Sequence, residues 1–477
     1  MTFDIKEILT SLGTENKIAL SLLSKWEAIR EEDISVTEFL SIAAHNPLPG
    51  GETSDAQSQS YPNQWVNKDM RILSLRLEGF RGIPDADEKS KVCYGLSMHP
   101  KMKWYQKATP FSMILLGSNG SGKTSLYSAI ELLCLGSTSV AEKHKIKEED
   151  IEKFYHHLSQ DNKPMKITVR FNDNPSHTVS KKEDFNKIRD HLDLSAFFCS
   201  ESDISIFECS GDSITDYLDA QIGLAELKKL KKFIEDIFEE LDRQEDSPES
   251  TAGISEESYQ ELTEIKGKID EEFDIIRSEV LTEAQYILSK LLKDYTDDVV
   301  GLSHTILQNT PNKPLFNGML KVKATDIEID PRNYLNNFRF KLYLISIRIA
   351  IAFHIMKTRS ISFPLMFDDV FDSSDFSNRI STKEFFGKIA DLYAELEISD
   401  TPLQMIFFTQ DEVIAESVFD GMSFDKEGQP RDSDVMFVRL YSVFPYQDNV
   451  DKKDIQTENG VNYYNLYDEI SIHVRNG

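Results

Sequence analysis

The sequence has 477 residues, enough for two or three domains of about 150 residues each. Hydrophobic residues make up 40% and charged residues 28%, a globular balance that excludes collagen-like, disulfide-stapled and largely disordered chains. With 53 basic and 81 acidic residues, the formal charge of −28 argues against a surface coated with phosphate-binding cations. This net charge does not exclude a local basic groove.

The four cysteines, Cys93, Cys134, Cys199 and Cys209, form no C-x-x-C pair, which gives a zinc site no support. Sparse, unpaired cysteine is typical of a reducing cytosol. The N-terminus lacks a cationic segment followed by an apolar one, and no apolar run approaches the roughly 18 residues of a membrane helix. We therefore expect a cytoplasmic protein without a membrane partner.

Residues 1–45 are predicted to be helical, because apolar residues such as Ile8, Leu12 and Trp26 recur at three-to-four spacing. This N-terminal extension is either a docking element for a partner or a cap on the following domain. Residues 46–69 are rich in Gly, Ser, Gln and Pro and are predicted to be a linker.

Residues 70–213 carry two strand signals. Arg71–Leu77 alternates between apolar and polar positions and is ended by Gly79–Gly82. Phe111–Leu116 is apolar and runs directly into a glycine-rich loop and a helix. This part is predicted to be the first lobe of an α/β domain.

Residues 214–300 are predicted to form two antiparallel helices, with Glu245–Gly253 (EDSPESTAG) at the tip. About 30 residues in each helix would give a length of roughly 45 Å. The segment is either a protruding arm or a helical subdomain packed on the body. Its lysines 228, 229, 231 and 232 lie among acidic residues, so they form either a solvated helix face or a DNA contact.

Residues 301–477 return to a mixed pattern. Tyr334–Met356 and Thr382–Leu396 are predicted helices, and Pro364–Phe367 and Gln404–Phe408 are predicted buried strands. Strands and helices therefore alternate on both sides of the helical segment. This arrangement indicates one α/β body that a helical insertion splits in sequence.

The most specific motif is a phosphate-binding loop, Gly117–Thr124 (GSNGSGKT), which matches G-x-x-x-x-G-K-[ST] between a strand and a helix. Its glycines permit a tight turn that points successive N–H groups at phosphate oxygens. Lys123 is predicted to reach the β- and γ-phosphates of ATP, and Thr124 to ligate Mg²⁺. The predicted nucleotide-binding residues of this loop are Gly117, Ser118, Asn119, Gly120, Ser121, Gly122, Lys123, Thr124 and Ser125.

A second acidic position complements this loop. Pro364–Asp369 (PLMFDD) is an apolar strand that ends in two carboxylates. Asp368 is predicted to support Mg²⁺. Asp369 is predicted to polarise the attacking water as general base.

Together with these motifs, four segments resemble the ABC-type ATPase heads of the structural-maintenance-of-chromosomes (SMC), RecF and RecN group. They are an opening strand and turn at Arg71–Gly82, a Q-loop segment at Phe197–Leu224, a D-loop at Asp372–Asn378 and a switch strand at Phe407–Asp411. The resemblance implies an α/β P-loop head split by a short coiled-coil hairpin. It also implies a head-to-head dimer or higher homo-oligomer with ATP between the heads, where the D-loop residue Asp375 contacts nucleotide.

Several positions depart from the family pattern. The signature L-S-G-G-[EQ] aligns with Leu335–Arg339, so that Asn336 replaces the serine that binds γ-phosphate and Phe338 replaces a glycine. Glu201 replaces the Q-loop glutamine and is a candidate Mg²⁺ ligand, and Gln410 replaces the switch histidine. These changes predict that ATP binds, and that hydrolysis is slow or gated by assembly.

The short hairpin and the run Phe367–Arg379 (FDDVFDSSDFSNR) are most similar to the ATPase subunits of Septu-type bacterial anti-phage defence, which pair with a separately encoded nuclease. The leading hypothesis is an ATPase that controls a nuclease partner. The alternatives are a DNA-repair ATPase of the RecF or RecN kind and a non-hydrolysing scaffold that ATP holds together. DNA is a candidate partner under the first two hypotheses.

Overall fold

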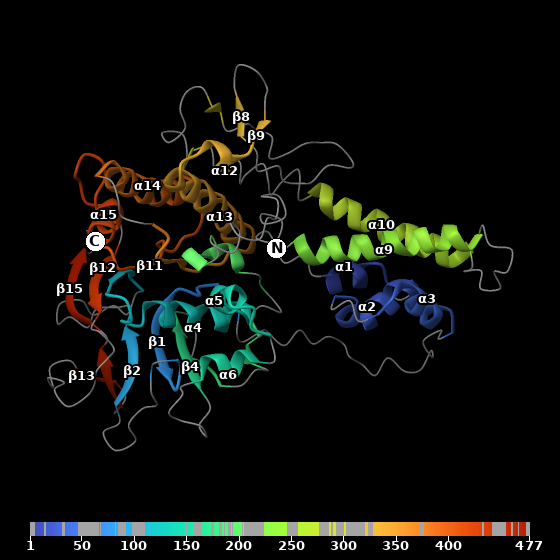
Figure 1. Cartoon of the computed structure of the whole chain (residues 1–477), viewed down its shortest axis with the longest axis horizontal. Helices are drawn as coiled ribbons and strands as arrows, with labels where there is room; N and C mark the ends of the chain where they lie inside the picture. Colours follow the sequence, from blue (N-terminus) through green and yellow to red (C-terminus); the bar gives the residue numbers. More distant parts are fainter. Residues whose placement is uncertain are drawn as a thin grey trace. The chain divides into compact units, whose positions relative to one another are not determined.

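The chain divides into two compact units in a computed structural model (Figure 1). One unit is α/β and comprises Gln64–Ile214, Glu283–Ile306 and Gly318–Gly477. The other is helical and comprises Met1–Asn63, Thr215–Thr282 and Leu307–Asn317. The structure describes residues 5–13, 16–30, 34–45, 66, 68–81, 83, 92–97, 110–147, 150–156, 165–172, 176–180, 184–185, 187–188, 192, 194–202, 204, 224–245, 256–275, 286–287, 290–291, 300–301, 320–322, 328–371, 376–431, 434–440, 455–458, 461–465 and 467–473.

The centre of the α/β unit is a six-stranded sheet in the order β15-β12-β3-β11-β10-β6. Neighbouring strands from β12 to β6 are parallel, and β15 runs antiparallel to β12. Both β3 and β11 are buried at every position, as expected for parallel strands that are covered on both faces. The bounds are β3 (Ser112–Leu116), β6 (Phe198–Ser200), β10 (Leu365–Asp368), β11 (Met405–Thr409), β12 (Val435–Leu440) and β15 (Tyr467–His473).

This sheet draws its strands from both sides of the helical segment. Strands β3 and β6 precede that segment in sequence, and β10, β11 and β12 follow it. The predicted fold class is therefore confirmed: an α/β P-loop ATPase fold that a helical hairpin interrupts, with a further helical segment at the N-terminus.

Four helices of the α/β unit bear on the site. They are α4 (Lys123–Leu135), α13 (Asn337–Arg359), α14 (Phe376–Glu395) and α15 (Glu412–Ser423). Helix α13 is buried at every position from Phe340 to Met356, so it is a core helix with no solvent-facing stripe in that stretch. Helices α14 and α15 approach closely, since a Cβ on Gly421 would lie 2.2 Å from the carbonyl oxygen of Lys383.

A second six-stranded sheet has the order β13-β14-β2-β1-β4-β5 and is antiparallel except for the β14–β2 pair. Strand β1 (Ile72–Glu78) alternates between buried and half-buried positions, as the sequence predicts. The other strands are β2 (Val92–Ser97), β4 (Lys166–Phe171), β5 (Ser176–Val179), β13 (Ile455–Glu458) and β14 (Val461–Asn465). Smaller elements are α5 (Ser139–Lys143), α6 (Ile151–Tyr155), η3 (Ser195–Phe197), α12 (Pro331–Tyr334), and a sheet of β7 (Val300–Gly301), β8 (Leu320–Val322) and β9 (Glu328–Ile329).

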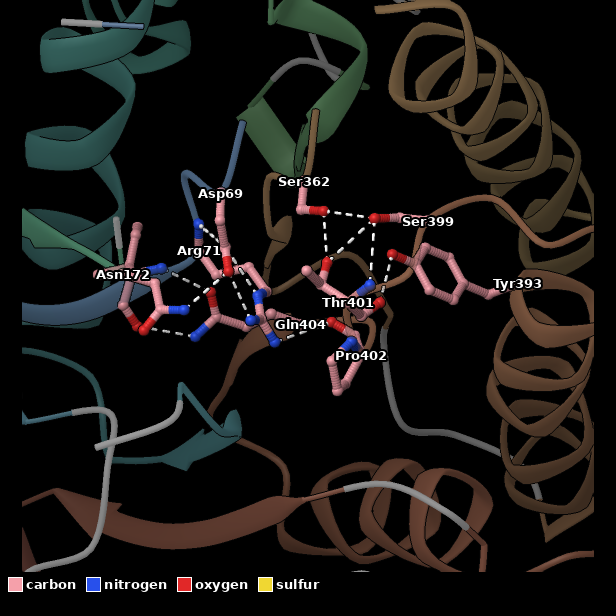
Figure 2. A network of polar contacts seen from close by, with 10 residues as sticks. Asp69, Arg71, Asn172, Ser362, Tyr393, Ser399, Thr401, Pro402 and Gln404 are labelled. Atoms are coloured by element: carbon pink, nitrogen blue, oxygen red, sulfur yellow. Dashed lines mark hydrogen bonds and ion pairs between the residues drawn. The ribbon is translucent and has the colours of Figure 1, made fainter. Parts of the chain in front are cut away.

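A buried polar network joins the two large sheets at the amino ends of the parallel strands (Figure 2). Arg71 donates to both carboxylate oxygens of Asp69, at 2.8 and 2.6 Å, and Asn172 donates to the same carboxylate at 2.7 Å. The Gln404 side chain accepts from the Ile72 N–H at 2.7 Å and donates to the Ile72 carbonyl at 2.9 Å. It thereby extends the backbone ladder from β1 across to β11.

The helical unit contains five described helices: α1 (Ile5–Ser11), α2 (Lys17–Arg30), α3 (Val36–His45), α9 (Leu224–Glu245) and α10 (Glu256–Ile275). Helices α9 and α10 are antiparallel, since Lys231 pairs with Asp270 at 2.7 Å while Phe238 packs on Tyr259 with ring centroids 5.3 Å apart. Their described parts have 22 and 20 residues. The predicted tip falls outside the described residues, apart from Glu245.

The N-terminal helices pack against this hairpin. Asn16 caps α2 through the Ala19 N–H at 2.8 Å, and its amide nitrogen donates to the Glu261 carbonyl on α10 at 3.3 Å. Phe39 on α3 packs edge-on against Phe233 on α9, with ring centroids 5.5 Å apart. The apolar stripes seen in the sequence are therefore buried against each other in a five-helix unit. In the described part of the chain, no helix has the length and apolar character needed to cross a membrane.

Candidate functional site

Four strands of the parallel sheet end at one edge, and each is followed by a residue that the sequence singles out. Strand register places Asp368 beside both Phe408 and Ser200, and Phe408 beside Leu115. The chain therefore continues from these neighbouring ends into the P-loop, Asp369, Gln410 and Glu201. In open α/β sheets ligands bind at this carboxyl edge, so the sheet topology alone gathers most of the predicted site.

The P-loop has the conformation that its glycines allow. Gly120 and Gly122 adopt φ values of 81° and 92°, which side chains disfavour. Gly122 is the N-cap of α4 and supplies no side-chain cap. The first N–H groups of the helix therefore lack the usual intramolecular acceptor and form a receptor for anionic oxygen.

The side chain of Lys123 is buried at the start of α4. Its ammonium donates to the Gly117 carbonyl at 2.6 Å and to the Ser118 carbonyl at 3.2 Å, so it lies across the loop. Burial lowers the pKa of Lys123, while the nearby charges of Asp369 and Asp368 raise it. This cation therefore lies close to both the phosphate loop and the two aspartates.

Asp368 is 6% exposed at the end of β10. The Thr124 hydroxyl donates to its carboxylate, yet the buried Oδ1 atom has no hydrogen-bond partner. Burial raises the pKa of Asp368 to about 7, aided by Asp369, although Thr124, Lys123 and Arg81 oppose the shift. A buried carboxylate that is short of positive charge is suited to a cation, and oxygen ligands from Asp and Thr are those that Mg²⁺ prefers.

Asp369 is held in one orientation. Its φ of 53° lies in the left-handed region, which Asp tolerates better than most residues, and its N–H donates to the Phe408 carbonyl at 2.9 Å. One carboxylate oxygen accepts from the Thr409 hydroxyl and from the Gln410 N–H, each at 3.3 Å. The link between Gln410 and Asp369 is therefore a backbone one, which the sequence did not predict.

The remaining predicted residues lie in different surroundings. Glu201 is exposed immediately after β6. Asn336 is the N-cap of α13, where its side-chain oxygen accepts from the Arg339 N–H at 2.8 Å. The Phe338 ring packs against Phe371 with centroids 5.5 Å apart. Asp375 lies outside the described residues.

Arg81 is a candidate site residue that the sequence reasoning did not assign. It follows β1 with a φ of 53°, and its buried Nη1 atom has no hydrogen-bond partner. Its charge lowers the pKa of Asp368, so the guanidinium lies within electrostatic range of the site. The signal that could have found it is the F-R-G turn that ends the opening strand.

Residues 70–354, more than half of the chain, match the AAA ATPase domain family. The chain belongs to this ATPase domain family. The matched region of the chain contains the P-loop, Arg81, Glu201 and Asn336, and it ends before Asp368.

Solved structures similar to this chain include two of the recombination mediator protein RecF of the RecFOR pathway. The RecF-ATPrS structure is 12% identical, covers 79% of this chain and 97% of its own, and has a TM-score of 0.37. The RecF-ATP structure is 11% identical, covers 80% and 98%, and has a TM-score of 0.38. At these scores the likeness carries no conclusion about function. Among curated proteins, none matches the chain.

Proposed function

We propose that this chain binds ATP with Mg²⁺ at the P-loop edge of its parallel sheet and hydrolyses it slowly or only after assembly. The observation that supports this most directly is the group formed by Lys123, Thr124 and Asp368. A buried ammonium, a hydroxyl and an under-coordinated carboxylate converge where the loop presents its N–H groups. This donor set is the one that a magnesium–triphosphate needs.

Thr124 and Asp368 would hold the metal, and Glu201 is a third candidate ligand. Magnesium supplies charge neutralisation between the phosphate oxygens. Lys123 would reach the β- and γ-phosphates in place of its present carbonyl acceptors. Arg81, whose charge acts on Asp368, would add a second positive charge to the site.

Asp369 would accept a proton from the attacking water. The Thr409 hydroxyl and the Gln410 N–H both donate to one oxygen of its carboxylate, which fixes the orientation of the carboxylate group. The second oxygen therefore keeps one position, from which it would accept the proton. Aspartate is one methylene shorter than the glutamate common in this role, so a slower hydrolysis than that of glutamate-containing relatives is expected. The Gln410 side chain would hydrogen-bond the γ-phosphate but would not exchange a proton.

We further propose that the ATPase acts as a head-to-head homodimer or higher oligomer that controls a separately encoded nuclease in anti-phage defence, in the cytoplasm. Asn336 and Asp375 of one copy would then complete the nucleotide site of another. The Septu-like run that begins at Phe367 and the charge of −28 support this proposal. Strong DNA binding by this chain alone is disfavoured, so a partner that supplies the nuclease or the basic groove fits better.

The test combines nucleotide binding with turnover on the purified chain, with and without DNA. Lys123→Ala should abolish ATP binding while the protein stays folded, and retained binding would overturn the proposal. Asp369→Asn should bind ATP but lose hydrolysis by about a hundredfold or more. If Asp369→Asn keeps both assembly and biological activity, ATP is only structural. Turnover stimulated by DNA with no nuclease encoded nearby would favour the RecF or RecN kind of repair ATPase.

A further inference from the structure

Helix α5 begins at two adjacent side chains, Thr138 and Ser139, which connect separate parts of the nucleotide site. Both are buried, with 1% and 2% exposure. Thr138 is the N-cap of α5 and accepts from the Ala141 N–H at 3.1 Å. We call this pair the α5 junction. It lies in none of the motifs that the sequence singles out.

Ser139 connects the P-loop helix to the end of β6. Its N–H and hydroxyl donate to the two carboxylate oxygens of Glu131 on α4, at 2.9 and 3.3 Å. The Ser200 hydroxyl on β6 donates to the Ser139 oxygen at 3.0 Å. Glu131 itself is 2% exposed. This buried chain runs from the helix that begins with Lys123 to the strand position directly before Glu201.

Thr138 connects the same point to Arg81. Its hydroxyl hydrogen-bonds the Tyr155 hydroxyl at the end of α6. The Tyr155 carbonyl accepts from the Arg81 N–H at 2.6 Å, and the Arg81 guanidinium lies 5.9 Å from the centre of the Tyr155 ring. The Phe80 ring stacks on the Tyr155 ring, with ring centroids 5.1 Å apart and an interplanar angle of 8°. Arg81 is therefore held by Tyr155, and Tyr155 by the α5 junction.

We propose that the α5 junction positions Glu201 and Arg81 together relative to the P-loop helix. The proposal rests on the proposed ATP binding and hydrolysis. Thr138 and Ser139 are positioning residues, because they act through Tyr155 and Ser200 and touch no phosphate. Buried hydrogen-bond chains tolerate few alternative geometries, so a change at the junction displaces both side chains that depend on it. Displacement by about 1 Å in such a supporting shell is enough to reduce turnover strongly.

The test compares Ser139→Ala, Ser200→Ala and Tyr155→Phe with the matched control Ser137→Ala. Ser137 lies two residues before Ser139. Among the described residues, its hydroxyl makes one hydrogen bond, an exposed one to the Glu142 carboxylate at 3.2 Å. We expect kcat to fall by about tenfold in the three junction variants, while ATP affinity changes by less than about threefold in the two serine variants and the control stays near wild type. Ser200→Ala removes the hydrogen bond between Ser139 and β6, so it serves if Ser139→Ala does not fold.

A merely structural role would lower the free energy of unfolding and leave kcat per folded molecule unchanged, which would overturn the proposal. The cycle of Tyr155→Phe and Arg81→Ala provides a readout that does not need hydrolysis. The two changes should be non-additive in ATP affinity, by about threefold or more, because Tyr155 acts through Arg81. If the wild type binds ATP without hydrolysing it, the proposed enzymatic function fails. The cycle still tests the junction in that case, because additive effects on ATP affinity would show that Tyr155 does not act through Arg81.

Discussion

The two ends of the parallel sheet satisfy their buried polar groups in opposite ways. At the amino end, Asp69 accepts from Arg71 and Asn172, and Gln404 bridges two strands (Figure 2). At the carboxyl end, Asp368 Oδ1 and the Ser121 hydroxyl are buried without a hydrogen-bond partner, as is the Arg81 Nη1 atom near them. Polar groups are rarely buried unpaired, so the carboxyl end is the one built to receive a ligand.

The buried aspartates at these two ends, Asp69 and Asp368, have pKa values that are shifted in opposite directions. Burial would raise the pKa of Asp69, but the hydrogen bond and charge of Arg71, with help from Asn172, outweigh it and hold that pKa below its usual value. Burial does raise the pKa of Asp368, to about 7, because its partners do not compensate. The Asp69 carboxylate therefore stabilises the fold, whereas the Asp368 carboxylate is suited to bind an external cation.

The largest effect on this comparison is expected from Arg71→Ala. It would leave Asp69 as a buried charge without its cation and should reduce the free energy of unfolding by about 3–5 kcal/mol. ATP affinity of the folded fraction should stay near wild type, because the network lies at the other end of the sheet. Urea denaturation and nucleotide titration measure the two quantities. A loss of affinity without a loss of stability would reverse the roles of the two ends.

Gln404→Met should have the next largest effect. The side chain keeps its approximate shape but loses its bonds to Ile72 and to the Phe111 carbonyl, which lies 2.9 Å from the Gln404 amide nitrogen. Three buried backbone groups lose a partner, so a loss of about 2–3 kcal/mol in the free energy of unfolding is expected. Chemical denaturation checks this. An unchanged midpoint would show that the two sheets are held together by other contacts.

Asp368→Asn should act in the opposite direction on stability. It removes a buried carboxylate that lacks partners, so the nucleotide-free protein should gain about 1–2 kcal/mol in the free energy of unfolding. The same change should remove the effect of Mg²⁺ on ATP affinity. Thermal melts with and without Mg²⁺ and ATP test both points, with Asp425→Asn, in an exposed turn, as control. Destabilisation by Asp368→Asn would mean that the carboxylate already has the partners it needs.

The smallest effect concerns acid. Since the folded pKa of Asp69 is lowered, its carboxylate contributes stability that is fully present above the unfolded pKa of about 3.9 and is lost as pH falls through the lower folded value. Wild type should therefore lose more stability than Asp69→Asn between pH 5 and pH 3. The comparison uses the pH dependence of the urea midpoint. Parallel slopes for the two proteins would contradict the assignment.

The sequence predicted the parts of this architecture that depend on short-range pattern. The P-loop needs only eight residues between a strand and a helix, and Asp368–Asp369 needs only the apolar strand before it. Parallel strand order then brings these motifs to one edge without further information. The fold class and the main α/β elements followed from the same local periodicities.

Long-range pairing accounts for what the sequence did not predict. Arg81 acts on Asp368 only because residues nearly 290 positions apart are brought together, and no local pattern encodes that. Amphipathic stripes in α2 and α3 indicate that a face is buried, but they do not specify that the covering surface is α9 and α10. The role of Gln404 was likewise missed, because one polar residue at a strand start has many ordinary explanations.

The most direct test of the central claim is calorimetric titration of ATP into wild type and Lys123→Ala, each with and without Mg²⁺. If the carboxyl end of the sheet is the ligand site, wild type binds ATP more tightly with Mg²⁺ than without it, and Lys123→Ala binds at least about a hundredfold more weakly in both conditions. Equal affinity of the two proteins, or an affinity that Mg²⁺ does not change, would contradict the claim.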